Sequence, residues 1–98
     1  TSVNQISSVI PDRFTLTQNY PNPFNPSTQI EFKISQSAST ILKVYNELGQ
    51  EVATLVNEHL APGSYNVHFV ADGLSSGVYF YRLTSGTHTE SKRMLLLK

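Results

Sequence analysis

The chain contains no cysteine. Disulfide bonds, thiolate zinc sites and cysteine nucleophiles are therefore excluded. Long hydrophobic runs are also missing, because the longest one extends only from Met94 to Leu97, whereas a membrane-spanning helix needs roughly 20 apolar residues. The first residues, Thr1 to Gln5, lack a basic stretch followed by an apolar one. If the protein is exported, we therefore expect its signal peptide to lie upstream, with this chain as one piece of a larger protein.

A surplus of positive charge is missing as well. Seven Lys and Arg residues balance seven Asp and Glu residues, so the formal net charge is zero. Attraction to nucleic acid or anionic lipid requires a basic surplus, and we expect no nucleic-acid partner. At 98 residues the chain is long enough for one domain with a modest core. Five tyrosines and five phenylalanines supply bulk for that core and argue against disorder.

Apolar and polar side chains alternate along most of the chain. In the clearest case Ile30, Phe32 and Ile34 share one face, and the polar residues between them share the other. The same alternation predicts further strands at 14–18, 41–45, 51–56, 65–71, 78–83 and 88–98. Turn residues, such as those around Gly49 and at Pro62-Gly63, separate these strands. Only residues 52–58 are ambiguous between strand and helix.

Seven short strands about ten residues apart are typical of an antiparallel β-sandwich. Gly77-Val78-Tyr79-Phe80-Tyr81 favours the immunoglobulin-like version, in which a corner tyrosine opens the sixth strand and bonds its hydroxyl to nearby backbone. Tyr79 is the candidate, and a core aromatic with a solvated hydroxyl is the alternative. We therefore predict an all-β fold, a seven-stranded antiparallel immunoglobulin-like β-sandwich over residues 14–98. The polar residues 1–13 are interpreted as a linker from an upstream domain.

The segment Tyr20-Pro21-Asn22-Pro23-Phe24-Asn25-Pro26 cannot form a helix or a central strand. Each proline fixes its own φ, lacks an N–H group and holds the preceding residue in extended geometry. The segment is therefore predicted to be a rigid, extended crossing that fixes how the first strand meets the sandwich. A calcium site around Asn22 and Asn25 is one hypothesis for the asparagines. Capping of turns by their side chains is the other.

Catalytic and metal-binding patterns are weak. Gly73-Leu74-Ser75-Ser76-Gly77 matches the G-x-S-x-G nucleophile elbow, but that motif requires a strand leading into a helix. Only His88 and Glu90 follow it, in the wrong order for a triad, so a loop at the rim of the sandwich is predicted instead. His59, His68 and His88 lack metal-ligand spacing, and the acidic residues are dispersed. We expect no enzyme activity, no catalytic residue, no cofactor and no bound metal.

Five blocks, in one order, nonetheless carry a resemblance. They are Phe14-Thr15-Leu16-Thr17-Gln18-Asn19-Tyr20-Pro21-Asn22-Pro23-Phe24-Asn25-Pro26-Ser27-Thr28, Lys43-Val44-Tyr45-Asn46-Glu47-Leu48-Gly49-Gln50-Glu51-Val52, Leu60-Ala61-Pro62-Gly63-Ser64-Tyr65, Leu74-Ser75-Ser76-Gly77-Val78-Tyr79-Phe80-Tyr81 and Lys92-Arg93-Met94-Leu95-Leu96-Leu97-Lys98. From about Pro11 to Lys98 the chain resembles the C-terminal sorting domains of the type IX secretion system, found on exported proteins of Bacteroidetes and related bacteria. The fold of that family is similar to the immunoglobulin-like module of flagellar hook-capping proteins.

The resemblance implies that the domain is a non-catalytic sorting signal. The folded domain would be recognised in the periplasm by the type IX outer-membrane translocon, which exports the cargo domain to the cell surface or the medium. It also implies a sortase-like protease that removes the domain, with cleavage inside the linker 1–13. The motif residues that define the fold are Pro21, Asn22, Pro23, Phe24, Asn25, Pro26, Gly49, Gly63, Gly77 and Tyr79.

The last strand is the candidate recognition element. Met94 and Leu96 alternate with Leu95 and Leu97, so the strand is apolar on both faces, which a sandwich alone does not require. One face can pack in the core while the other contacts the translocon. The candidate recognition residues are Lys92, Arg93, Leu95, Leu97 and Lys98. The alternative to recognition is that the N-terminal segment or the cargo domain covers Leu95 and Leu97.

A second hypothesis for the whole chain is an immunoglobulin-like accessory module. Such a module would stabilise a neighbouring catalytic domain or bind carbohydrate through exposed aromatic side chains. Tyr45 and Phe80, both outward by their position in the alternation, are the candidate platform residues.

Overall fold

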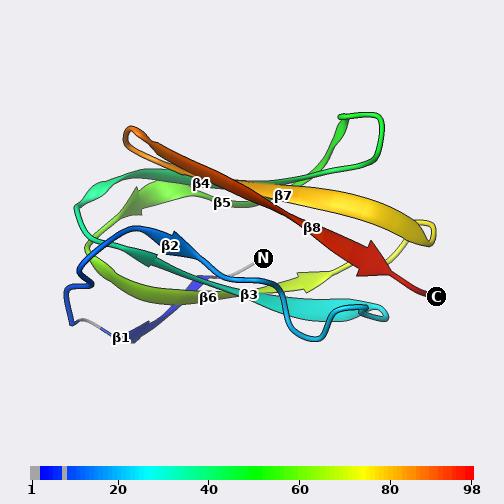
Figure 1. The fold of residues 1–98 in the computed structure, drawn as a ribbon, viewed down its shortest axis with the longest axis horizontal. Coiled ribbons are helices and arrows are strands. Elements are labelled where there is room, and N and C mark those ends of the chain that lie inside the picture. The colour runs from blue at the N-terminus through cyan, green and yellow to red at the C-terminus, as the bar shows by residue number, and fades with distance from the viewer. Residues whose placement is uncertain (1–2, 8) are drawn as a thin grey trace.

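The computed structural model describes residues 3–7 and 9–98, and all regular structure in those residues is β-strand (Figure 1). The strands are β1 (Val3–Ser7), β2 (Thr15–Leu16), β3 (Ser27–Ile34), β4 (Ala38–Tyr45), β5 (Glu51–Leu60), β6 (Gly63–Val70), β7 (Gly77–Ser85) and β8 (His88–Leu96). The all-β prediction is confirmed, and the ambiguous stretch 52–58 is part of β5. Across the residues described, no helix has the length and hydrophobicity needed to cross a membrane.

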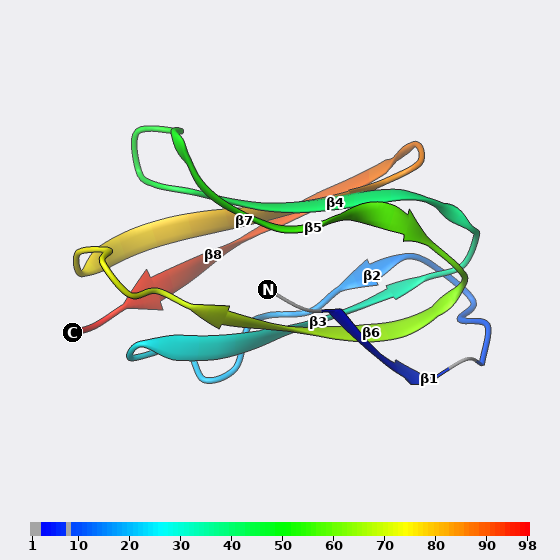
Figure 2. The same ribbon diagram turned by 180° about the vertical axis from the view of Figure 1, so that it is seen from behind.

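The strands form two four-stranded antiparallel sheets packed as two layers (Figures 1 and 2). Sheet A has the order β1-β6-β3-β2, and sheet B has the order β5-β4-β7-β8. The chain passes from one sheet to the other after β3, after β5 and after β6. Neighbouring strands such as β3 and β6, or β4 and β7, are therefore far apart in the sequence.

One core lies between the two sheets and follows from the period-two alternation of side chains. The hydrophobic residues that are at most 2% exposed come from both sheets and from the proline segment: Leu16, Phe24, Ile30, Phe32, Ile34, Leu42, Val44, Val56, Val67, Ala71, Tyr81, Leu83, Met94 and Leu96. Ile30, Phe32 and Ile34, which were predicted to share one face, all belong to this set, so the alternation predicted for β3 is confirmed. The core predicted for β8 is also confirmed, because Met94 and Leu96 are buried.

The predicted number of strands is wrong: the described residues form eight strands, not seven. The additional strand, β1, lies within the segment 1–13 that was interpreted as a linker, and it pairs with β6 at the edge of sheet A. Alternation could not reveal it, because β1 is polar and mostly exposed. Its close approach depends on Gly63, where a Cβ atom would lie 2.6 Å from the carbonyl oxygen of Ser7.

Two tyrosines fasten the starts of β6 and β7. The Tyr79 hydroxyl donates to the carbonyl oxygen of Ser75 at 2.7 Å, which confirms the predicted corner bond. Tyr65 makes the equivalent bond to the carbonyl oxygen of Ala61 in sheet A. Each bond spans four residues at a point where the chain has just crossed between the sheets.

Candidate functional site

The five predicted recognition residues occupy different environments at the end of β8. Arg93 and Leu95 lie on the outer face of sheet B, and Leu97, which follows the strand, is 50% exposed. Lys92 has the opposite parity, on the side of Met94, and is half-buried. The backbone N–H of Lys98 donates to the Ser76 hydroxyl at 2.9 Å. Three of the five residues therefore contribute to one outward surface.

Strand β7 extends this surface. Val78 is directly opposite Leu95, and Phe80 is directly opposite Arg93. Side chains opposite one another on the same face of a sheet are in contact range. We call the surface made by Val78, Phe80, Arg93, Leu95 and Leu97 the C-terminal face. The sequence indicated that Phe80 points outward, but only the β7–β8 register reveals that Phe80 and Val78 adjoin the last strand.

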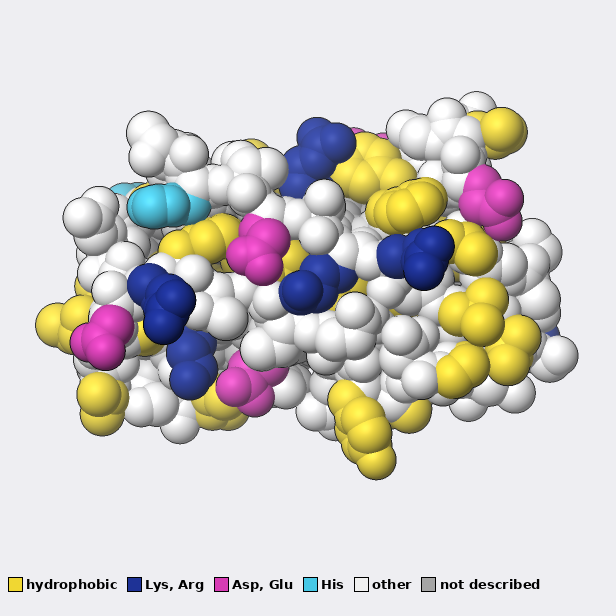
Figure 3. Space-filling model, in the orientation of Figure 1, with side chains coloured by type: hydrophobic (Ala, Val, Ile, Leu, Met, Phe, Trp, Pro, Cys, Tyr) yellow, Lys and Arg dark blue, Asp and Glu magenta, His cyan; other side chains and the backbone are white. Residues whose placement is uncertain are grey.

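The C-terminal face combines apolar area with a positive charge. Figure 3 shows hydrophobic side chains gathered beside a basic group at the end of the molecule where β8 finishes. Phe80 is 40% exposed and Leu97 is 50% exposed. A hollow of about 280 Å³ opens beside them, lined by Asn22, Pro23, Val78, Arg93, Met94 and Leu95. Grouped exposed apolar side chains of this kind are typical of a protein-binding surface.

The proline segment holds β8 in place. We call residues 18–24 the proline strap; they run beside the outer edge of β8. The Phe24 N–H donates to the Leu95 carbonyl oxygen at 3.0 Å, and the Leu97 N–H donates to the Phe24 carbonyl oxygen at 3.0 Å. The Asn22 Oδ1 accepts from the Leu95 N–H at 3.0 Å, and the Gln18 Nε2 donates to the Arg93 carbonyl oxygen at 2.6 Å. These bonds fix the backbone that presents Arg93, Leu95 and Leu97.

The asparagine and phenylalanine of the strap have structural contacts. Phe24 is 2% exposed and packs against Phe69 with ring centroids 6.1 Å apart. The side chain of Asn22 accepts from the Leu95 N–H, 73 residues away, which is a long-range contact and not the local turn capping that the sequence suggested beside a calcium ligand. The carbonyl oxygen of Pro26 accepts from the Ala71 N–H at 2.9 Å. The segment therefore ties β8, the core and the end of β6 together.

A buried hydrogen-bond network anchors the start of the strap. The Asn19 N–H donates to the Tyr81 hydroxyl at 2.8 Å, and that hydroxyl donates to the Thr17 carbonyl oxygen at 2.7 Å. The Asn19 side-chain amide donates to the Thr28 hydroxyl at 3.0 Å, and Thr28 donates to the Pro21 carbonyl oxygen at 2.9 Å. Burial raises the pKa of Tyr81 to about 12, because the charged phenolate is disfavoured away from water. Tyr81 therefore remains a neutral hydrogen-bonding group across the physiological range.

The two candidate platform residues do not form a free aromatic surface. Tyr45 and Phe80 are opposite one another across β4 and β7. The Arg82 guanidinium lies over the Tyr45 ring, 5.1 Å from its centroid, in a cation–π contact. Of these two rings, Phe80 is the more exposed, at 40%.

The residues considered for chemistry lie apart. Ser75 is in the loop between β6 and β7, with strands on both sides, and its carbonyl oxygen accepts from Tyr79. His88 stacks on Phe14 with ring centroids 5.2 Å apart. Within residues 3–7 and 9–98, no group of three or more His, Cys, Asp or Glu side chains could hold a metal ion. No strand-to-helix elbow exists at Ser75 that would expose a nucleophile.

Comparisons with known proteins agree with this picture. The sequence model of the family described as "Secretion system C-terminal sorting domain" matches residues 18–97. No curated protein matches the chain. A solved structure of PorZ, described as an essential bacterial surface component of the type-IX secretion system of Porphyromonas gingivalis, superimposes with a TM-score of 0.59. That protein is 18% identical, and the match covers 95% of this chain but 12% of PorZ, so the likeness concerns the fold.

The matched residues 18–97 include the proline strap, both tyrosine corners and the C-terminal face. The family is defined by sorting and not by catalysis. The resemblance to type IX sorting domains is thereby confirmed, and the chain belongs to the secretion system C-terminal sorting domain family.

Proposed function

We propose that this domain is a non-catalytic sorting signal that directs a larger protein through the type IX outer-membrane translocon. The observation that carries the proposal, beyond family membership, is the C-terminal face, where Leu95 and Leu97 lie beside Val78 and Phe80. A signal that is read by another protein needs an exposed surface with a fixed shape. The C-terminal face meets both requirements, because Phe80 and Leu97 are exposed and the backbone of β8 is bonded to the proline strap.

Arg93 and the apolar residues have separate roles in this proposal. Leu97 and Phe80 provide area that a partner desolvates, and burial of such side chains supplies most of the affinity at interfaces. Arg93 is exposed directly opposite Phe80 and orients an acidic or carbonyl-bearing group of the partner. Lys98 extends the positive charge beyond Leu97. Lys92, on the opposite parity of β8, is the least involved of the five candidates.

The cargo domain precedes this chain in the proposal, and residues 1–13 connect the two. If a sortase-like protease removes the domain, cleavage falls between β1 and β2 or upstream of β1. Val9 and Ile10 lie outside the strands and are 76% and 67% exposed. Exposed chain outside a sheet is the preferred substrate of proteases, whereas β1 is paired with β6. The cargo would pass through the periplasm and finish at the cell surface or in the medium.

Deleting the last five residues is expected to trap cargo in the periplasm, but this test is not selective. The deletion removes Met94 and Leu96, which are 1% and 0% exposed, together with Leu95 and Leu97, whose backbone groups bond to the strap. Loss of secretion could then result from unfolding. Substitutions confined to exposed side chains separate recognition from stability.

The selective test is the double variant Arg93→Ser with Leu97→Ser, in a fusion to a secreted cargo in a type IX host. Both side chains are exposed, so we expect the domain to fold normally. Loss of one hot-spot contact or more should reduce export by about tenfold or more, with cargo accumulating in the periplasm. The matched control is Val70→Ser, which removes a 45% exposed apolar side chain from β6 of sheet A. Fractionation and immunoblotting measure the distribution of cargo.

Normal export of the double variant would contradict recognition through the C-terminal face. Equal loss of export in the Val70→Ser control would contradict it too, since the effect would then be general. Thermal unfolding of the purified variants shows whether the domain remains folded.

A further inference from the structure

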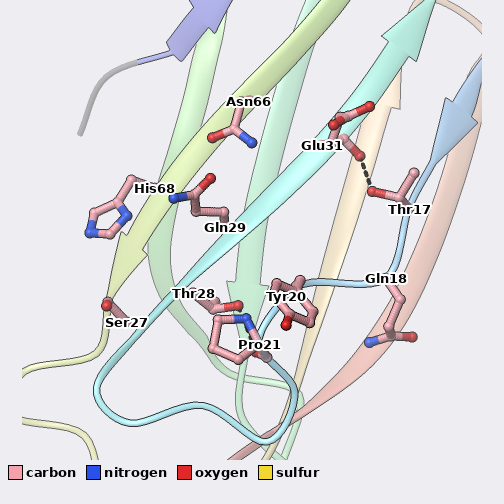
Figure 4. Close-up of a pocket in the computed structure, with 10 residues that line it drawn as sticks. All are labelled: Thr17, Gln18, Tyr20, Pro21, Ser27, Thr28, Gln29, Glu31, Asn66 and His68. Carbon is pink, nitrogen blue, oxygen red and sulfur yellow. Dashed lines mark hydrogen bonds between the residues drawn. The ribbon is translucent and has the colours of Figure 1, made fainter.

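A second surface lies on the opposite layer of the molecule. A hollow of about 530 Å³ opens on the outer face of sheet A, on strands β3 and β6, and is bounded by the proline strap (Figure 4). Its lining comprises Thr17, Gln18, Tyr20, Pro21, Ser27, Thr28, Gln29, Glu31, Asn66 and His68. A volume of several hundred Å³ is enough for a small ligand or a few sugar units.

The floor of the hollow is a regular array of polar side chains. Gln29 is directly opposite His68, and Glu31 is directly opposite Asn66, so these four residues form two adjacent cross-strand pairs. Figure 4 shows the side chains of Gln29 and Asn66 on the same face of the sheet, with His68 beside them. Within the described part of the chain, the side chains of these four residues take part in none of the hydrogen bonds that hold the hollow together. Their donors and acceptors remain available to a ligand.

Tyr20 forms one wall of the hollow. Its side chain is 81% exposed. Its backbone is nevertheless fixed, because the Tyr20 N–H donates to the Gln29 carbonyl oxygen at 2.9 Å and the Gln29 N–H donates back at 3.0 Å. Pro21, the next residue, restricts the backbone further. An exposed aromatic ring is thereby held at a defined place beside the polar floor.

The chemistry of the lining selects the class of ligand. On the floor, the amides of Gln29 and Asn66 and the imidazole of His68 can donate to and accept from hydroxyl groups, and the carboxylate of Glu31 accepts from them. The aromatic ring at the wall offers a face against which the C–H groups of a sugar can stack. Among the described residues that line the hollow there is no Lys or Arg, and Glu31 is one of them, which disfavours anions. Apart from Tyr20 and Pro21 the lining is polar, which disfavours the apolar core of a protein interface.

We propose that this hollow binds a neutral oligosaccharide, with Tyr20 stacking on one sugar ring and Gln29, Glu31 and Asn66 binding its hydroxyl groups. The site is distinct from the C-terminal face and from the Tyr45–Phe80 pair, both of which lie on sheet B. Because it does not depend on export, it stands or fails separately from the proposed sorting function. The domain would then contact a glycan through one sheet and its secretion partner through the other.

The test is a two-dimensional NMR titration of the 98-residue chain with mannohexaose, maltohexaose and cellohexaose. For an open hollow we expect a Kd of about 1 mM for at least one of them, with shifts concentrated at residues 29, 31, 66 and 68. Tyr20→Ala should weaken binding about tenfold or more, because it removes the stacking ring and leaves the backbone bonds to Gln29 in place. The matched control is Phe80→Ala, which removes a 40% exposed ring from sheet B and should leave the affinity unchanged.

Gln29→Ala is the second variant and should also weaken binding, while a dispersed spectrum shows that the fold is retained. The proposal is overturned if none of the three sugars shifts these resonances at about 10 mM, ten times the expected Kd. It is equally overturned if binding survives both Tyr20→Ala and Gln29→Ala, or if the upstream protein covers the same four residues when it is attached.

Discussion

The two edge strands of sheet B, β5 and β8, are protected from further pairing in different ways. The register of β5 against β4 shifts twice, because Leu55 and Val52 are extra residues between paired positions. Bulges and exposed polar residues such as Glu58 and His59 discourage pairing with another chain. The edge of β8 is instead covered by the proline strap through backbone hydrogen bonds.

The strap also stops the sheet from growing beyond it. Pro21 and Pro23 have no N–H group and cannot donate to a further strand, and within residues 18–24 the strap bonds to β8 through Gln18, Asn22 and Phe24. Cover of this kind leaves β8 with regular geometry, whereas bulges distort β5. The strand bearing the candidate recognition residues is thus the one whose edge is covered, from Arg93 to Leu97, by another segment of the chain. Its side chains, and not its edge, are what a partner can reach.

Phe24→Ala is expected to have the largest effect on the difference between the covered edge of β8 and the bulged edge of β5. The change removes a large buried side chain, and with it the packing that holds the strap against the core. We expect a loss of about 3–5 kcal/mol in the free energy of unfolding, measured by urea denaturation. The exposed edge of β8 should also favour self-association, detectable by light scattering. Phe80→Ala, which truncates an exposed ring, is the control, and a loss below about 1 kcal/mol for Phe24→Ala would contradict the anchoring role.

Tyr81→Phe tests whether the buried hydrogen-bond network at the start of the strap stabilises the domain. The substitution keeps the ring and removes the hydroxyl, which leaves the buried Asn19 N–H without a partner. We expect a loss of about 1–3 kcal/mol in the free energy of unfolding near neutral pH. An unchanged stability would mean that the network does not hold the strap.

The same substitution should change the response to alkali. The pKa of Tyr81 is raised by burial from 10.0 to about 12 in the folded chain, so its contribution to stability is fully present below about pH 10. It is lost as the pH rises from 10 towards 12, because the unfolded chain ionises first. Denaturation curves at pH 8, 10 and 11.5 should therefore show a smaller alkaline loss for Tyr81→Phe than for the unaltered chain.

The smallest expected effect, and the sharpest comparison of the edges, comes from Asn22→Ala. This variant removes one hydrogen bond to the Leu95 N–H, which should cost about 0.5–1.5 kcal/mol and accelerate hydrogen exchange of that amide by up to about tenfold. Lys43→Ala is the control at the β5 side, since it removes the exposed ion pair with Glu51 at 3.0 Å. It should leave exchange of the Leu95 amide unchanged. If the Leu95 amide exchanged at a similar rate in both variants, the bond from Asn22 would not distinguish the edge of β8 from the edge of β5.

Local patterns predicted the parts of the fold that depend on neighbouring residues. Alternation placed Ile30, Phe32 and Ile34 in the core, and Gly49 has the positive φ, +83°, that the turn before β5 requires. Tyr79 was identifiable because its bond reaches back only four residues. In each case the cause and its consequence lie within a few positions of one another.

Long-range contacts could not be predicted in the same way. Asn22 and Leu95 are 73 residues apart, and nothing in either segment indicates that they bond. The prolines excluded a helix or a central strand, but they did not reveal which strand the segment would cover. The polar strand β1 was missed because its position depends on contact with Gly63 and not on a hydrophobic pattern. The association of Val78 and Phe80 with Leu95 and Arg93 likewise required the register between strands.

The distance along the chain between the strap and β8 also has a consequence for biosynthesis. While the ribosome has made only the first 70 residues, Phe24 and Asn22 have emerged but β7 and β8 do not yet exist. Closure of such a long loop costs conformational entropy, and this cost is offset only when the strap can form its contacts with the last strand. The bonds between the strap and β8 can therefore form only once synthesis has passed Leu97, so the C-terminal face is the last part of the domain to be completed.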